Sequence, residues 1–192
     1  MLPLPSRFSL SFCFLMIRCD MRAYGKHCWR RKGCHISTRY RLIRAWRTGD
    51  TTCRILLTPA VILAKFFLAP TYDTELPWRA DCGPGLYLPH PQGVIVAGDA
   101  RLGVRVTLFQ QVTLGGWNDG SPRLKSRVAV FAGAKIFGKV TIGRRSFVGA
   151  NAVVARSVPP WHTAVGVPAV SQPRTDAEAQ RFGRGQSERA RS

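Results

Sequence analysis

From residue 82 onward, aliphatic side chains recur at every sixth position of the chain. One set of these positions holds only β-branched aliphatic residues: Val130, Ile136, Ile142, Val148 and Val154. A second set, four residues further along each repeat, holds small or medium residues: Ala134, Val140, Ser146, Ala152 and Val158. An ordinary strand alternates with a period of two, so a period of six indicates a repeat architecture.

The same step continues in the earlier part of the repeat. It runs through Cys82, Leu88 and Val94, then makes one eight-residue step to Leu102. Each hexad supplies one short strand and one corner, so three hexads predict an 18-residue triangular coil with its aliphatic residues along the axis of a prism. A β-sandwich with glycine-rich turns is the alternative, but its strands would need turns every 8 to 12 residues.

The repeat marks the domain boundaries of the chain. It breaks once, between Gly116 and Arg127, where we expect a projecting loop of the kind that often carries function. The chain then divides into an uncertain N-terminal extension (1–35), a helical segment (36–72), a β-helix domain (73–170) and a basic tail (171–192). We expect the tail to be disordered, because it is polar and nearly free of large apolar residues.

Two helices are predicted ahead of the repeat. Leu42, Ile43 and Trp46 form an apolar stripe at helical spacing, and a second helical stretch covers residues 56–68. The apolar run of residues 55–69 contains a proline and a lysine and is shorter than the roughly 20 residues of a membrane span. It therefore predicts a buried or interfacial helix.

The charge of the chain changes this picture only at its N-terminal side. The formal charge is +19, and residues 1–60 hold 12 Lys and Arg against two acids, Asp20 and Asp50. A basic face of this kind suits anionic lipid, nucleic acid or a phosphate-bearing ligand. No zinc-finger spacing, RNP-like motif or recognition-helix pattern accompanies it, which argues against nucleic-acid binding as the main function. Peripheral membrane contact through the basic N-terminus stays open.

The cysteines favour a reduced protein. Five of the six precede residue 54, and none forms a C-x-x-C pair or joins a histidine at metal-ligand spacing, so we expect no metal. Residues 8–17 are apolar enough for the core of a signal peptide, but no small-residue cleavage site follows them. We therefore expect a cytoplasmic location, with the true start open among Met1, Met16 and Met21.

Four segments, in order and at matching spacing, resemble the hexapeptide-repeat acyltransferases, and among them the serine O-acetyltransferase group. They are LPHPQGVIV at 88–96, VTLFQQVTLGG at 106–116, AGAKIFG at 132–138, and VPP with GVPA within 158–169. The resemblance covers about residues 73–170. It implies a left-handed parallel β-helix that transfers acetyl from acetyl-CoA, as co-substrate, to a hydroxyl. The helical domain typical of the cysteine-biosynthesis enzymes is shortened in this chain.

The resemblance assigns His90 as the general base of the reaction. A hydroxyl is a weak nucleophile at neutral pH, and a positioned imidazole can take its proton as it attacks the thioester. In the family an acidic residue 15 positions upstream orients this base, and the matching residue is Glu75. The alternatives are that His90 is an ordinary corner histidine and that Glu75 is a solvated or capping acid.

The resemblance also implies how CoA and the subunits are arranged. In the family CoA lies along a groove between neighbouring subunits of a homotrimer, held largely by backbone groups. The matching small residues are Gly116, Ala132 and Ala150, and Lys135 and the Arg144–Arg145 pair suit the nucleotide phosphates. The alternative is that these positions are corner packing and solvated surface.

The sequence departs from the serine-specific pattern around the acceptor site. Pro89 stands where the serine-specific enzymes have Asp, and Gly120–Pro122 stands where their loop has Arg-His-Pro, so Arg123 is the candidate to bind the acceptor carboxylate. The Leu-Pro-His-Pro segment also resembles acetyltransferases of surface-polysaccharide clusters. Three functions follow: O-acetylation of L-serine for cysteine biosynthesis as the lead, O-acetylation of a sugar, and a non-catalytic solenoid.

Overall fold

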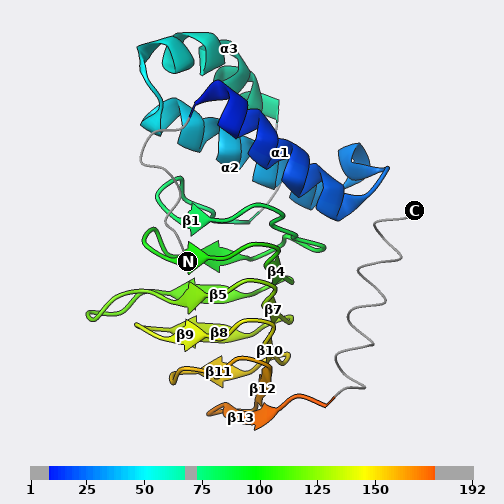
Figure 1. Ribbon diagram of the computed structural model, residues 1–192, viewed down its shortest axis with the longest axis vertical. Coiled ribbons are helices and arrows are strands. Elements are labelled where there is room, and N and C mark those ends of the chain that lie inside the picture. The colour runs from blue at the N-terminus through cyan, green and yellow to red at the C-terminus, as the bar shows by residue number, and fades with distance from the viewer. Residues whose placement is uncertain (1–8, 68–72, 176–192) are drawn as a thin grey trace.

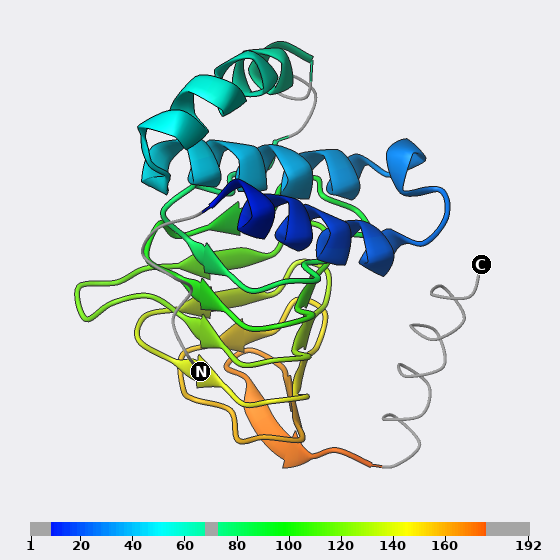
Figure 2. The same ribbon diagram turned by 45° about the horizontal axis from the view of Figure 1, so that its top comes forward.

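The computed structural model describes residues 9–67 and 73–175. Helices α1 (Leu10–Tyr24), α2 (Lys32–Thr48) and α3 (Thr51–Phe67), with the short 3-10 helix η1 (Cys28–Arg30), lie across one end of a solenoid (Figures 1 and 2). Helix α1 lies inside residues 1–35, which the sequence left as an uncertain N-terminal extension. Its buried residues Cys13, Met16 and Ile17 follow helical spacing and pack in one cluster with Cys53 and Leu57 of α3.

The solenoid consists of short strands that form three sheets. Sheet A contains β2 (Ile95–Val96), β5 (Thr113–Gly115), β8 (Lys135–Phe137) and β11 (Val153–Val154). Sheet B contains β1 (Asp81–Cys82), β3 (Arg101–Leu102), β6 (Arg123–Leu124) and β9 (Thr141–Ile142). Sheet C contains β4 (Thr107–Leu108), β7 (Ala129–Val130), β10 (Phe147–Val148), β12 (His162–Val165) and β13 (Val170–Pro173). All pairings are parallel except that of β12 with β13.

The core runs along the axis of this prism. The second residue of each two-residue strand points inward, and Leu102, Leu108, Leu124, Ile142 and Val148 are fully buried. Val130 pairs with Val148 and Ile136 with Val154, 18 residues apart, as the hexad period predicted. The predicted fold class, a parallel β-helix preceded by helices, is confirmed.

The structure corrects the phase of the repeat near its start. Val96, rather than Val94, takes the inward position in β2, because Ile95 and Val96 pair with Thr113 and Leu114. The eight-residue step therefore lies between Leu88 and Val96, not between Val94 and Leu102. The chain thus places two extra residues in the corner that holds His90.

The structure also shortens the projecting loop. The sequence predicted a break from Gly116 to Arg127, but β6 resumes the repeat at Arg123, which pairs with Arg101 and Thr141. The loop is therefore 116–122 and ends before Arg123 rather than at Arg127. Trp117 and Gly120 close the loop by exchanging two backbone hydrogen bonds of 2.9 Å.

The C-terminal boundary differs as well. Ser171–Pro173, predicted as the beginning of a disordered tail, belong to β13, which pairs antiparallel with β12. The exposed side chains of β13 give no alternating pattern from which a strand could be predicted. Residues 176–192 of the predicted tail lie outside the described residues.

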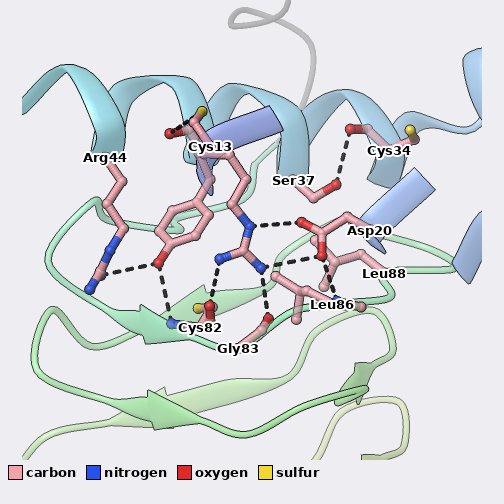
Figure 3. A network of polar contacts seen from close by, with 12 residues as sticks. Cys13, Asp20, Cys34, Ser37, Arg44, Cys82, Gly83, Leu86 and Leu88 are labelled. Atoms are coloured by element: carbon pink, nitrogen blue, oxygen red, sulfur yellow. Dashed lines mark hydrogen bonds and ion pairs between the residues drawn. The ribbon is translucent and has the colours of Figure 1, made fainter. Parts of the chain in front are cut away.

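A buried polar network fastens the helices to the first coil (Figure 3). Arg41 of α2 and Asp20 of α1 form an ion pair of 2.8 Å with both side chains fully buried. The Asp20 carboxylate accepts the backbone N–H groups of Gly85 and Leu86 at 2.8 and 3.0 Å, and Arg41 donates to the carbonyl of Gly83 at 2.7 Å. These contacts satisfy backbone groups that the first coil cannot pair with a preceding coil.

Candidate functional site

His90 lies in the corner that connects sheet C to sheet A. From Tyr87 to Ile95 the chain takes eight residues, whereas one coil later it takes six from Thr107 to Thr113. The His90 side chain is exposed. This corner is therefore two residues longer than the next one, and its exposed imidazole is open to a ligand on this edge.

The backbone on both sides of His90 is fixed. Leu88 is buried, and its N–H donates to the Tyr24 hydroxyl of α1 at 2.9 Å. Pro91 is buried, and its carbonyl accepts a hydrogen bond from the Thr74 hydroxyl. The short polar segment Pro89–His90 is therefore held between two anchored residues.

Glu75 enters the site at the start of sheet A. Its N–H donates to the Val94 carbonyl at 2.8 Å, and its carbonyl accepts the N–H of Val96 at 2.9 Å. Its carboxylate is exposed, and within the described chain no hydrogen bond or ion pair joins it to the ring of His90. The Thr74 contact brings the two segments together, while the two functional side chains remain apart.

Three of the predicted CoA residues lie along the same edge as His90. Ala132 and Ala150 occupy the equivalent corners of later coils, and the Asn151 N–H donates to the Ala132 carbonyl at 2.9 Å. Lys135 of β8 donates from Nζ to the carbonyls of Gln111 and Gly133 at 2.8 and 3.0 Å. The edge thus carries small side chains beside one ammonium group.

Gly116 and Arg123 lie on the opposite side of sheet A from His90, toward sheet B. Gly116 follows β5, and Arg123 is an exposed residue of β6 in sheet B. The hydroxyl of Ser121, in the loop between them, donates a hydrogen bond to the Asp99 carboxylate. A single chain therefore does not bring Gly116 or Arg123 to the corner of His90.

A groove of about 720 Å³ lies on a different part of the solenoid, between sheet B and its corner with sheet C. Gly83, Val104, Lys125, Gly143, Arg144 and Pro160 are among the residues that line it, and of the site residues predicted from the sequence Arg144 alone is one of them. Arg144 thus points to a different edge from Lys135. In the part of the chain that the structure describes, no group of His, Cys, Asp and Glu is placed to hold a metal ion.

An arginine ladder that was not predicted from the sequence lies at the corner between sheets B and C. Arg105, Arg127 and Arg145 occupy the same left-handed corner position in successive coils, with φ of 55°, 62° and 59°. Arg145, with smaller effects of burial and the neighbouring arginines, lowers the pKa of Arg127. The spacing of 22 and 18 residues follows the coil length and is the signal that could have revealed the ladder.

Known proteins are similar to this chain in both amino-acid sequence and fold. No family model matches the chain. The serine acetyltransferase of Escherichia coli (strain K12) is 35% identical over 152 residues, which cover 76% of this chain and 53% of the E. coli protein. The chain is a homologue of the serine acetyltransferases. It spans about half the length of the curated relatives that it matches.

Two solved serine acetyltransferases extend the comparison to the fold. One, a complex with CoA, has a TM-score of 0.66 and 26% identity and covers 85% of this chain and 71% of its own. The soybean serine acetyltransferase complexed with serine has a TM-score of 0.66 and 28% identity, with 83% and 69% covered. The resemblance to serine acetyltransferases that the repeat segments predicted is confirmed.

Proposed function

We propose that the chain is an acetyl-CoA-dependent O-acetyltransferase with L-serine as its acceptor and His90 as its general base. The observation that carries this proposal is the exposed imidazole of His90, on a corner two residues longer than its counterparts and anchored at Leu88 and Pro91. Homologues of the same fold are solved with CoA and with serine.

The reaction needs one proton acceptor at this corner. As the acceptor hydroxyl attacks the acetyl carbonyl, its oxygen forms the new C–O bond and its proton passes to the His90 ring. The C–S bond then breaks, and the protonated imidazole returns the proton to the departing thiolate. A general base of this kind contributes about 10² to 10⁴ in rate.

Glu75 acts as the partner of His90 in this proposal. A carboxylate hydrogen-bonded to the second ring nitrogen would hold the tautomer that accepts a proton and stabilise the imidazolium. The Glu75 backbone is held by its pairing with β2 beside the corner. The Glu75 carboxylate would therefore reach the His90 ring by a change of side-chain rotamer.

The edge below His90 is the proposed location of CoA. Ala132 and Ala150 leave the backbone of two corners open to a close ligand, and the Lys135 ammonium can exchange a carbonyl partner for a phosphate oxygen. Gly116 would contribute from the far end of sheet A, across a subunit boundary.

We propose a homotrimer, and the separation of the site residues supports a site shared between two copies. His90 and Arg123 lie at different corners of the prism, so a neighbouring copy is needed to place Arg123 beside His90. Mixed assemblies of the His90→Ala and Arg123→Ala variants should recover part of the activity, because some sites then combine two intact edges. Mixtures of His90→Ala with Glu75→Gln, which alter the same edge, should recover less. Failure of the first mixture to exceed the second would contradict the shared site.

The acceptor is tested by comparing L-serine with saccharides. We expect CoA release with L-serine, with a weak apparent affinity because Pro89 and Gly120–Pro122 remove groups that would pair with the zwitterion. Arg123→Ala should lower kcat/KM for serine, while Arg101→Ala, an exposed arginine of the same sheet, should not.

The same departures favour a second candidate, O-acetylation of a sugar of a surface polysaccharide. A saccharide preferred by about tenfold or more, with the serine rate unchanged in Arg123→Ala, would replace the serine proposal. Absence of CoA release with every acceptor would instead favour the non-catalytic solenoid.

A further inference from the structure

Helix α3 has two apolar faces, of which only one is covered. Its inner face is buried at Cys53, Leu57, Val61 and Ala64, and the first three pack in one cluster with residues of α1 and α2. The outer face is apolar and open, with exposed fractions of 67% for Ile55, 59% for Leu63 and 75% for Phe66. Leu56 and Ile62 extend the same face and are also more than half exposed. A contiguous apolar surface of this kind on a helix marks an interaction site.

This face points away from the rest of the molecule. In Figures 1 and 2, α3 lies on the side of the helical layer remote from the solenoid, with α1 and α2 between them. A large flat partner can therefore approach the face without contacting the sheets.

The exposed charges of the helical layer are almost all positive. Among residues 9–67, Asp20 is buried in its pair with Arg41, and Asp50 is the one exposed acid. Arg54 and Lys65 are exposed near the two ends of α3 itself. The exposed cations of the whole helical layer are Arg18, Arg22, Lys26, Arg30–Lys32, Arg47, Arg54 and Lys65.

We propose that the outer face of α3 docks the protein on an anionic lipid bilayer. The apolar side chains would enter the interface between headgroups and acyl chains, and Arg54 and Lys65 of α3 would lie at the level of the lipid phosphates. No helix among the described residues is long and apolar enough to cross a membrane, so α3 would lie in the plane of the surface. A second copy of the chain fits less well, because a symmetric contact would bring these cations against each other.

The experiment uses the full chain and vesicles of phosphatidylcholine with and without phosphatidylglycerol, in a co-sedimentation assay. We expect pelleting with the anionic vesicles that weakens as salt rises, and little with the neutral ones. The double variant Leu63→Ser/Phe66→Ser should lower the partition coefficient at least tenfold. Arg54→Gln/Lys65→Gln should lower it on anionic vesicles only.

Matched controls exist on the solenoid, at the other end of the molecule. Val170→Ser, at an exposed valine of β13, and Lys139→Gln/Arg156→Gln, at exposed cations, should leave partitioning unchanged. Equal binding to neutral and anionic vesicles, or unchanged binding of Leu63→Ser/Phe66→Ser, would overturn the proposal. If that variant instead reduced the size of the assembly in solution without changing vesicle binding, the face would belong to a second copy. None of these readouts depends on acetyl transfer.

Discussion

The backbone N–H of Leu88 donates a hydrogen bond of 2.9 Å to the hydroxyl of Tyr24, which lies 64 residues earlier in the chain. Leu88 precedes His90 by two residues, so helix α1 directly contacts the segment that carries the proposed base. Helix α2 contacts the same residue, because a Cβ at Gly33 would lie 2.0 Å from the Leu88 carbonyl oxygen. The helical layer therefore positions the corner of His90 as well as covering the first coil.

Substitution of Gly33 tests this contact. In Gly33→Ala the new methyl group must displace α2 or Leu88, and overpacking of this kind costs about 1–3 kcal/mol. We expect a lower free energy of unfolding in urea and, through the shifted corner, a lower kcat. Gly98→Ala is the matched control, since its Cβ would meet only the Cβ of Arg79 at 3.9 Å. Equal stability of the two variants would show that Leu88 is not held by α2.

Substitution of His90 tests the proposed chemistry. His90→Ala should lower kcat by about 10²-fold or more and leave the binding of acetyl-CoA intact, while Glu75→Gln should cost less. His162→Ala changes a histidine whose ring contacts the Pro160 carbonyl, away from the corner of His90, and should retain activity. Near-normal acetyl transfer by His90→Ala would exclude this residue as the base.

The buried pair of Arg41 and Asp20 predicts a large loss of stability when one partner is removed. Arg41→Met leaves the Asp20 carboxylate buried and unpaired, and breaking such a pair costs about 3–5 kcal/mol. Asp20→Asn keeps the shape but weakens the bonds to Gly85 and Leu86. Urea unfolding of both single variants and the double variant should show strongly non-additive losses. Additive losses would indicate that the pair does not act as one unit.

The buried thiols predict a loss of stability at alkaline pH. Burial raises the pKa of Cys13 and Cys82 to about 11 and that of Cys34 to about 12. Above a pH of about 8.5 these thiols ionise in the unfolded chain but not in the folded one, so stability falls as pH rises toward 11 or 12. The slope approaches about 1.4 kcal/mol per pH unit for each thiol.

Urea midpoints measured between pH 7 and 10.5 check this dependence. Cys82→Ala should flatten the decline, whereas Cys19→Ser, at a partly exposed thiol, should leave it unchanged. A stability that stays constant across this range would contradict the prediction.

The hexad period predicted the solenoid because an aliphatic residue in every sixth position is required to fill a three-sided core. The phase failed at Val94, Ile95 and Val96, where three consecutive apolar residues fit the inward position equally well. The pairing of Ile95 with Thr113 resolves the phase and moves the insertion to His90. Sequence alone could identify the histidine but not the corner that projects it.

Two other features depended on contacts that are distant in the sequence. Helix α1 is stabilised by Cys13, Met16 and Ile17 against α3 and by Asp20 against the first coil, and its own sequence pattern does not specify these partners. Arg123 is separated from His90 because Arg123 belongs to β6 of sheet B. The sequence does not show to which sheet Arg123 belongs until the length of the loop 116–122 is known. The local sequence pattern therefore predicted the repeating coil. The helical layer at its first coil and the relative positions of the site residues depend on packing between distant segments.

Both open ends of the solenoid are closed by this chain itself. At the first coil, Asp20, Tyr24 and Arg41 occupy backbone groups that a further strand would otherwise pair. At the last coil, β13 runs antiparallel along β12 and covers the edge of sheet C. Exposed edges of parallel strands are templates for end-to-end growth into fibres. The two closures oppose growth along the axis and leave the flat sheets as the faces through which the proposed homotrimer would form.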